Sequence, residues 1–373
     1  MKEICLMQIM MIANDSNFAY NLRREVLQTL VQAGHRMNLT CQILSYEEEL
    51  KEIGCNLIGA DVQRRGTNPF ADLQLFIKYY RILKKQKPDL VLTNNIKPNV
   101  YAGLACRLLK IPYIVNITGL GTPLEIPGPL QILTAALYKI GVKKAQCVFF
   151  QNEENMQFFY DRKLLGNNTR AELLPGSGVN LQAHPLQEYP EGEKIHFLFA
   201  ARVMKEKGID QFLAAARKFH SENVIFEICG ACDDPQYLKV LQDAHDQGIV
   251  LYHGLQKDMN PFYQRCSCFL YPSYYPEGMS NVLLEAAASG RPVIAADRSG
   301  CRETVDDGVT GYIVPVQDEQ ATIEAVEKFL QLSREERRQM GLAGRRKMEQ
   351  EFDRAKVIDA YMQAVERAET SAL

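Results

Sequence analysis

The chain alternates between short apolar, strand-like runs and longer helix-like segments along almost its whole length. A strand predicted at residues 4–13 is followed by a helix over about residues 21–33 that ends at Gly34, and the alternation resumes at residues 195–200. Residues 174–194, rich in Pro and Gly, predict a connector between the two runs. Strands that alternate with helices favour parallel sheets covered on both faces. The sequence therefore predicts an α/β fold with two doubly wound, Rossmann-like domains facing a cleft.

The length of 373 residues supports this division, because a chain of that size is long for one core. The predicted N-terminal domain spans residues 1–183 and the predicted C-terminal domain spans residues 184–352. Residues 353–373 contain a last helix whose apolar positions, including Tyr361 and Val365, recur at helical spacing. This helix is expected to pack back on the N-terminal domain.

Composition and cysteine usage indicate a soluble globular protein of the cytoplasm. Apolar residues make up 46% of the chain and charged residues 24%, and most of the ten cysteines stand in apolar runs, as in a reducing compartment. A four-thiolate zinc site built from Cys229, Cys232, Cys266 and Cys268 is the minor interpretation. Nothing resembles a signal peptide, and no run approaches the roughly 18 apolar residues of a membrane span.

Charge is distributed unevenly between the two halves. Residues 1–185 carry 21 Lys and Arg against 15 Asp and Glu, whereas the remainder carries 22 against 30. A basic N-terminal half can face an anionic membrane surface or a phosphorylated acceptor. The apolar-basic run at residues 76–85 fits a helix resting on anionic head groups, or equally a sheet-covering helix with a solvated stripe. The net charge of −2 gives nucleic-acid binding little support.

The segment 276–285 (Pro-Glu-Gly-Met-Ser-Asn-Val-Leu-Leu-Glu) places two carboxylates around the start of a predicted helix. Glu277 lies in a loop after a strand-like run, and Glu285 lies inside a helix whose expected N-cap is Ser280. Gly278, which lacks a Cβ, lets the backbone approach a ligand. The loop and the helix N-terminus favour an anion, whereas the carboxylates favour hydroxyl groups. Together they predict a nucleotide sugar as the ligand.

Two cations follow the predicted strand at residues 195–200. Arg202 and Lys207 stand at its carboxyl end, just before a helix. A guanidinium can hold two phosphate oxygens, and an ammonium acts as a point charge. The pair can therefore neutralise a diphosphate leaving group as a glycosyl bond breaks. The alternative interpretation is a solvated turn, because residues 205–207 form an ordinary charge run.

In chain order these segments give Arg-x4-Lys-Gly, then Pro-Ser-x3-Glu-Gly-x6-Glu, Ala-x-Gly-x-Pro-Val-Ile and Gly-x-x-Glu-x-Val-x-Asp-Gly-x-x-Gly. This order resembles the retaining family 4 glycosyltransferases of GT-B fold over residues 195–315, and more loosely in the N-terminal half. Segments such as Tyr20-Asn-Leu-Arg23 and Asn94-Asn-Ile-Lys97 are similar to the branch of capsular-polysaccharide and diacetylbacillosamine-lipid N-acetylgalactosaminyltransferases.

The resemblance implies a nucleotide-sugar-binding C-terminal domain and an acceptor-side N-terminal domain. Arg202 and Lys207 would hold the donor diphosphate, Glu285 the ribose hydroxyls, and Glu277 the transferred sugar as the candidate catalytic residue. Further donor contacts are assigned to Gly278, Met279, Ser280, Asn281 and Val282, and the acceptor side to Asn14, Thr118 and Gly119.

The chain departs from the family pattern at three places. Ala201 stands where Gly usually precedes the Arg, residues 14–17 lack a Gly-Gly pair, and residues 116–119 lack a His. The missing Gly-Gly pair removes donor contacts that the family pattern places in the N-terminal domain. The missing His removes a side chain that the pattern places near the acceptor.

The expected reaction transfers an N-acetylhexosamine or hexose from a UDP-sugar with retention of configuration. The leaving phosphate can take the acceptor proton, because none of the six His falls in a convincing base position. No Asp-x-Asp occurs, so no catalytic metal and no cofactor are expected. The expected acceptor is a polyprenyl-diphosphate-linked saccharide of surface polysaccharide assembly, at the inner face of the cytoplasmic membrane.

Other functions remain open at this stage. A nucleotide-sugar 2-epimerase of the same fold and a glycosyltransferase with a soluble acceptor are the enzyme alternatives, and a non-catalytic sugar-binding module is disfavoured. A dinucleotide dehydrogenase fits poorly, since no Gly-x-Gly-x-x-Gly follows a first strand, and a P-loop nucleotidase is excluded because its glycine loop is missing.

Overall fold

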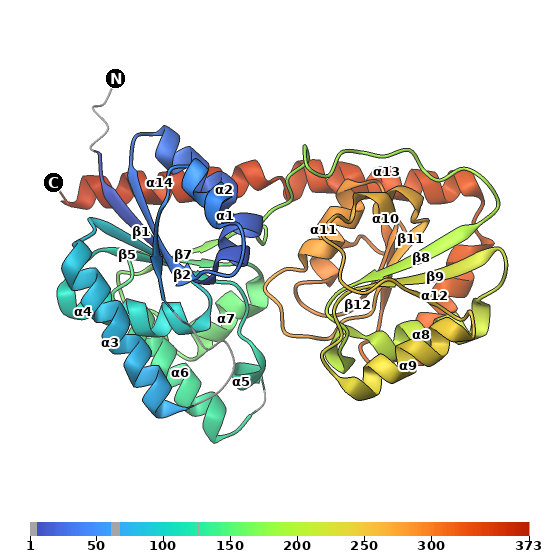
Figure 1. The fold of residues 1–373 in the computed structure, drawn as a ribbon, viewed down its shortest axis with the longest axis horizontal. Coiled ribbons are helices and arrows are strands. Elements are labelled where there is room, and N and C mark those ends of the chain that lie inside the picture. The colour runs from blue at the N-terminus through green and yellow to red at the C-terminus, as the bar shows by residue number, and fades with distance from the viewer. Residues whose placement is uncertain (1–5, 61–67, 126, 373) are drawn as a thin grey trace. The chain divides into compact units, whose positions relative to one another are not determined.

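The computed structural model describes residues 6–60, 68–125 and 127–372. The chain divides into two compact units, and each is a parallel α/β sheet covered by helices (Figure 1). The first unit comprises residues 1–177, 276–278 and 355–373, and the second comprises residues 178–275 and 279–354. The predicted α/β class is confirmed. The first two residues of the strand predicted at 4–13 lie outside the described residues.

The first unit contains a seven-stranded parallel sheet in the order β3-β2-β1-β4-β5-β6-β7. The order reverses between β1 and β4, which is where doubly wound sheets bind ligands. The register of β1 against β2 shifts between Ile12 and Asp15, as at a β-bulge. Asp15 then caps α1 by accepting a hydrogen bond from the Phe18 amide. The strands are β1 (Gln8–Asp15), β2 (Arg36–Gln42), β3 (Asn56–Gly59), β4 (Leu90–Asn94), β5 (Tyr113–Ile117), β6 (Cys147–Phe150) and β7 (Arg170–Leu173).

Two hydrophobic cores cover the two faces of this sheet, because successive residues of β1 point in opposite directions. Met10 belongs to the core under α3, α4, α6 and α7, whereas Met11 belongs to the core under α1 and α14. Tyr361 and Val365 of α14 are buried in the second of these cores. The helical segments are α1 (Ser16–Gln32), α2 (Glu47–Glu52), α3 (Pro69–Gln86), the π-helical turn η1 (Pro98–Ala102), α4 (Gly103–Leu109), α5 (Thr122–Glu125), α6 (Pro129–Val142), α7 (Glu153–Asp161) and α14 (Arg354–Ala372).

The second unit contains a six-stranded parallel sheet in the order β10-β9-β8-β11-β12-β13. Its order reverses between β8 and β11, so the loops that follow these strands leave the same edge side by side. The strands are β8 (Ile195–Ala200), β9 (Val224–Cys229), β10 (Leu251–Tyr252), β11 (Cys268–Tyr271), β12 (Val293–Ala296) and β13 (Gly311–Val314).

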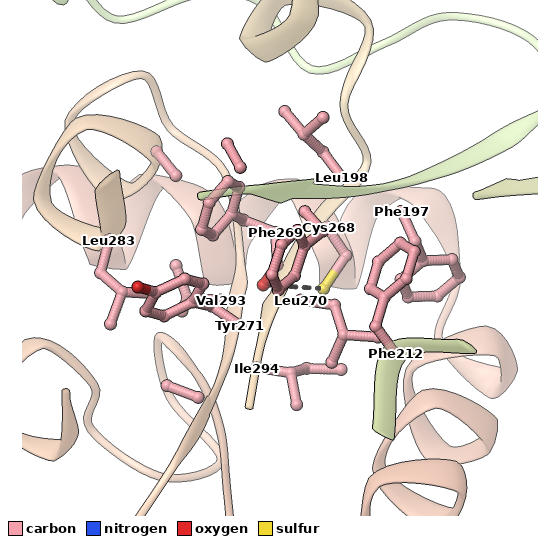
Figure 2. Packing of buried hydrophobic residues seen from close by; sticks show 14 of the residues in the cluster. Phe197, Leu198, Phe212, Cys268, Phe269, Leu270, Tyr271, Leu283, Val293 and Ile294 are labelled. Atoms are coloured by element: carbon pink, nitrogen blue, oxygen red, sulfur yellow. Dashed lines mark hydrogen bonds between the residues drawn. The ribbon is translucent and has the colours of Figure 1, made fainter. Parts of the chain in front are cut away.

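A single hydrophobic cluster holds the second unit together. Phe197 of β8, Tyr271 of β11 and Leu283 of α11 pack within it, together with side chains of β12 (Figure 2). The stiff strands fix where the following loops begin, because each strand is anchored by side chains in this cluster. The helices are η2 (Lys205–Lys207), α8 (Ile209–Phe219), α9 (Pro235–Asp246), α10 (Asn260–Arg265), α11 (Asn281–Ala288), η3 (Arg302–Thr304), α12 (Glu319–Gln331) and α13 (Arg334–Glu351).

The run at residues 76–85, considered above as a membrane helix, forms part of α3. Tyr79 and Leu83 are buried in the core of the first unit, and the exposed side carries Arg81, Lys84 and Lys85. The apolar side chains of this run therefore pack against the sheet, in agreement with the second interpretation given above, a sheet-covering helix. Within the described part of the chain, no helix combines the length and the hydropathy needed to span a bilayer.

Candidate functional site

The loop after β8 brings two cations to the switch point of the second unit. Arg202 is exposed, and no carboxylate among the described residues pairs with its guanidinium. Lys207 is followed by Gly208 in the left-handed conformation (φ 82°). A Cβ at Gly208 would collide with the carbonyl of Pro272. Only glycine therefore lets the β8 loop pass this close to the β11 loop.

Ala201, which replaces an expected glycine, causes no backbone strain. Its φ is not positive, so an L side chain is accepted there. A glycine is required instead at Gly230, after the neighbouring strand β9. Its φ is 151°, and the carbonyl of Ala201 occupies the space that a Cβ would fill. The departure from the family pattern thus leaves the course of the loop unstrained.

Lys207 is held in place by two aromatic side chains. Its ammonium donates a hydrogen bond to the Tyr271 hydroxyl at 3.0 Å and lies 4.7 Å from the centre of the Tyr275 ring. Cation–π contact and hydrogen bonding both restrict the long side chain, which otherwise has much rotamer freedom. The ammonium is therefore pre-positioned at the carboxyl end of the sheet.

The start of α11 leaves polar groups without protein partners. Ser280 is the N-cap residue, as predicted, but its hydroxyl caps no backbone amide. The Ser280 Oγ and Asn281 Oδ1 atoms are buried and have no hydrogen-bond partner among the described residues. The Ser280 hydroxyl, at the helix N-terminus, can donate to an anionic ligand, whereas Asn281 Oδ1 can accept a hydrogen bond from a ligand hydroxyl. Met279 and Val282, by contrast, pack in or against the hydrophobic cluster, so only their backbones are left for a ligand.

Glu285 stands one turn into α11 and is held by a buried tyrosine. The Tyr263 hydroxyl donates a hydrogen bond to Glu285 Oε2 at 3.0 Å. Burial raises the pKa of Glu285 to about 7, while the hydrogen bond from Tyr263 and the charge of Arg354 act in the opposite direction. A carboxylate with this pKa is largely ionised above neutral pH and can accept hydrogen bonds from a diol.

Glu277 and Gly278 group with the first unit. The Asn152 side chain donates to the Gly278 carbonyl at 2.6 Å, and the Gly278 amide donates to the Thr118 carbonyl at 3.2 Å. A Cβ at Gly278 would lie 2.7 Å from that Thr118 oxygen. The close packing against Thr118 therefore requires a glycine at this position. Gly119 packs against the same loop: a Cβ added at Gly119 would lie 3.0 Å from the Gly278 nitrogen.

Asn95 connects the acceptor-side candidates to one another. Its side chain accepts a hydrogen bond from the Asn14 amide at 3.1 Å and donates to Thr118 Oγ1 at 3.3 Å. Asn95 is also one of the few non-glycine residues with positive φ, at 72°. Asn14, Thr118 and Gly119 are therefore brought together at the switch point of the first unit, and Thr118 and Gly119 contact the Glu277–Gly278 loop.

Behind this cluster the first unit buries an arginine. Arg23 of α1 is fully buried, and its guanidinium donates to Asn94 Oδ1 at 3.1 Å and to Ser177 Oγ at 3.0 Å. Tyr361 of α14 donates to the same Asn94 oxygen and receives a hydrogen bond from Asn116. The network ties α1, β4, β5 and α14 together with neutral oxygen acceptors.

His253, which follows β10, belongs to an ion cluster. Its Nε2 lies 2.7 Å from Glu227 Oε2, and His196 and Arg265 contact the same buried carboxylate. Burial would raise the pKa of Glu227, but hydrogen bonds from His196, Arg265 and His253 hold it well below its usual range.

The cysteines considered for zinc are separate thiols. Cys229, Cys266 and Cys268 are buried, and Cys232, in the loop after β9, is half-buried. Burial raises the pKa of the Cys266 thiol to about 12, which disfavours the thiolate that zinc requires. No group of three or more His, Cys, Asp or Glu side chains arranged to hold a metal occurs in the described ranges.

Sequence reasoning missed the residues that hold the others in place. Tyr263, Tyr275, Asn95 and Asn152 were not singled out, although each contacts a candidate residue. Asn152 had a readable signal, because Asn followed by Glu-Glu after a strand predicts an N-cap, and it does cap α7. The other three act through contacts that are distant in sequence.

Two Rossmann-like sheets, each with polar side chains gathered at its switch point, define an α/β protein of GT-B architecture. Residues 8–152 match the family described as glycosyl transferase 4-like, and residues 185–347 match the family described as glycosyl transferases group 1. The chain belongs to the glycosyl transferases, with a 4-like N-terminal part and a group 1 C-terminal part.

Curated relatives agree with this assignment, and a solved structure shares the fold. The chain is 25% identical over 324 residues to an N,N'-diacetylbacillosaminyl-diphospho-undecaprenol alpha-1,3-N-acetylgalactosaminyltransferase of Campylobacter jejuni, covering 82% of this chain and 84% of that protein. It is 26% identical to the capsular polysaccharide glycosyltransferase CapM of Staphylococcus aureus, covering 85% and 87%. The crystal structure of Anabaena HepE with UDP and glucose superposes with a TM-score of 0.79 at 15% identity, over 96% of this chain and 100% of that one.

Proposed function

We propose that the protein is a retaining, metal-independent glycosyltransferase that moves an N-acetylhexosamine or hexose from a UDP-sugar to a lipid-linked saccharide. The observation that carries the proposal is the switch point of the second unit. There Arg202, Lys207 and the unpaired Ser280 hydroxyl gather around loops from β8 and β11, with Glu285 on the same helix as Ser280. Cations and an unpaired helix start suit a diphosphate, and the carboxylate suits a ribose diol.

In this reaction the acceptor hydroxyl attacks the anomeric carbon on the face from which the diphosphate departs. The bond between the anomeric carbon and the phosphate oxygen breaks, the bond to the acceptor oxygen forms, and the proton passes to the departing phosphate. Arg202 and Lys207 stabilise the negative charge that grows on the diphosphate. Glu277 is assigned to the transferred sugar on the resemblance, and the supporting observation is that Asn152 anchors its loop.

UDP is favoured as the nucleotide because HepE was crystallised with UDP, and one Escherichia coli relative is named for UDP-Gal. A thermal-shift panel of UDP- and GDP-linked sugars tests the site directly. We expect UDP-sugars to raise the Tm by roughly 5 °C at a hundredfold excess over Kd. Glu285→Ala and Arg202→Ala should lose this response, whereas Arg217→Ala, an exposed arginine on α8, should keep it. A wild-type response in both site variants would remove the assignment.

Three further measurements separate this reaction from its alternatives. Proton NMR of the product should show the anomeric configuration of the donor, and an inverted linkage would contradict the mechanism. Activity should survive a chelator, and loss that Mn²⁺ reverses would contradict metal independence. Conversion of the UDP-sugar without any acceptor would instead favour a nucleotide-sugar 2-epimerase.

A lipid-linked acceptor at the inner face of the cytoplasmic membrane is supported by the names of two relatives, which act on diphospho-undecaprenol substrates. The first unit offers a surface for such a membrane on the outer side of α6 (Figure 1). Leu130, Ile132 and Leu133 are 45–72% exposed there, and Ile140 continues the stripe. The helix contains no acidic residue, and its C-terminal end carries exposed Lys139, Lys143 and Lys144.

Insertion of these side chains at an anionic surface would combine apolar burial with attraction of the lysines. Co-sedimentation with vesicles of phosphatidylglycerol and of phosphatidylcholine tests this part of the proposal. The double variant Ile132→Ser/Leu133→Ser should release the protein from anionic vesicles, and a control double variant, Val309→Ser/Val316→Ser, should not. Equal binding by all three proteins would place any membrane contact elsewhere, and activity on a water-soluble acceptor alone would favour a soluble substrate.

A further inference from the structure

Tyr263 is the one described side chain that hydrogen-bonds the Glu285 carboxylate. Its hydroxyl donates to Oε2 at 3.0 Å, and Oε1 has no protein partner among the described residues. Glu285 lies on α11 and Tyr263 on α10, twenty-two positions earlier in the chain. The contact therefore depends on the packing of the second unit and not on any local motif.

The tyrosine is itself tightly held. Tyr263 is fully buried, the Phe269 ring lies 6.1 Å from its ring centre, and the His184 ring meets it edge-on at 6.1 Å. Burial first, and then the neighbouring Glu285, raise the pKa of the Tyr263 hydroxyl well above its usual value. The hydroxyl consequently remains a hydrogen-bond donor near neutral pH.

We propose that Tyr263 is a positioning residue for the donor, which binds Glu285 Oε2 so that Oε1 is turned toward the hydroxyl groups of the ligand. This inference rests on the proposed function, because it assigns the diol of a nucleoside diphosphate to Glu285. Oε2 thus accepts its hydrogen bond from the protein, and Oε1 accepts from the ligand. A carboxylate fixed in this way loses less rotamer entropy on binding than one that is free to turn.

The same contact sets the pH range in which the site works. Tyr263 from α10 and Arg354 at the start of α14 act on Glu285, and the tyrosine itself has His184 from the connector, Cys229 and Cys266 around it. Burial lowers the pKa of His184 to about 4, so His184 is neutral near pH 7. Tyr263 and Arg354 both favour the ionised form of Glu285. Loss of the tyrosine hydroxyl should therefore shift the onset of binding to higher pH.

The test measures UDP binding to the full-length protein by isothermal titration calorimetry from pH 5.5 to 8.5. In the wild type, affinity should rise with pH through about pH 7, where Glu285 ionises. Tyr263→Phe should weaken binding by about tenfold at pH 7.5, since a hydrogen bond to a charged group is lost. Its pH midpoint should move upward, and Glu285→Gln should show no such midpoint.

Tyr189→Phe is the matched control. Tyr189 is also a buried tyrosine of the second unit, and its hydroxyl donates to the Ser267 carbonyl at 2.9 Å, away from Glu285. This variant should match any loss of stability in Tyr263→Phe but keep the wild-type affinity and midpoint. A wild-type midpoint in Tyr263→Phe, or an equal shift in Tyr189→Phe, overturns the inference. If Glu285→Gln binds UDP as the wild type does, the proposed donor site itself has failed.

Discussion

The two units share a topology but differ in the chemistry of their switch points. In the second unit two cations stand at the end of the sheet: Arg202 is exposed, and Lys207 is half-buried and contacts the side chains of Tyr271 and Tyr275. In the first unit the corresponding region carries amides, and Arg23, which contacts Asn94 there, is buried in the core with neutral oxygens as its acceptors. A Rossmann-like sheet therefore fixes where a site can form, and the loop residues decide what it can bind.

The largest effect is expected when both cations of the second unit, Arg202 and Lys207, are removed. Arg202→Ala/Lys207→Ala should weaken UDP binding by at least about a hundredfold, because two charge-assisted contacts with the diphosphate are lost. Calorimetry gives the Kd. Asn95→Ala, at the switch point of the first unit, should leave the UDP affinity near the wild-type value. A comparable loss in Asn95→Ala would mean that the amide cluster contributes equally to the nucleotide.

The sealed arginine should behave in the opposite way. Arg23→Ala should lower the free energy of unfolding by about 3 kcal/mol, because it leaves a cavity and removes one hydrogen-bond donor from each of Asn94 and Ser177. Urea denaturation measures this loss, and UDP binding to the folded variant should remain intact. A stable Arg23→Ala protein that has lost UDP binding would reverse the roles assigned to the two regions.

Titration of Glu285 gives a smaller effect. The pKa of about 7 in the folded protein exceeds the ordinary value of 4.5, so its contribution to stability is present below pH 4.5 and is lost as pH rises through 7. Glu285→Gln should therefore gain stability relative to wild type at pH 8 compared with pH 4.5, by about 1–2 kcal/mol after discounting for partial exposure. Denaturation curves at the two pH values supply the comparison. A constant difference between the proteins would contradict the raised pKa.

The smallest effect concerns the left-handed Asn95. Asn95→Gly removes the side-chain contacts but relieves the positive φ, whereas Asn95→Ala removes the contacts and keeps the strain. The alanine variant should be less stable than the glycine variant by about 1 kcal/mol. Equal denaturation midpoints would show that the backbone here relaxes freely.

Much of the fold could be predicted from the sequence, because long apolar runs and the glycines that end them are local signals. The first helix stops where Gly34 takes a positive φ, and the helix start at Ser280 is confirmed. The short edge strands β3 and β7 gave no such signal, since they span four half-exposed residues each. The first helix was expected to begin near residue 21, but Asp15 caps a helix that begins at Ser16.

The candidate site was predictable only in part. Arg202 and Lys207 could be assigned to one edge because they directly follow a strand. The Tyr263–Glu285 pair and the Asn95–Thr118 pair could not be found, because each joins residues from separate elements. The packing of Gly278 against Thr118 could not be predicted either, because a single sequence does not show which neighbouring loop lies against a glycine.

The unequal burial of the thiols has a practical consequence. Among the cysteines that the structure describes, Cys232 alone is partly accessible, and the others lie in the interior with little reactivity toward alkylating agents. A maleimide dye should therefore attach at Cys232, on the loop that follows β9 and packs beside the Arg202 loop through Val203. The protein thus carries a built-in attachment point from which occupancy of the neighbouring loops can be followed by fluorescence.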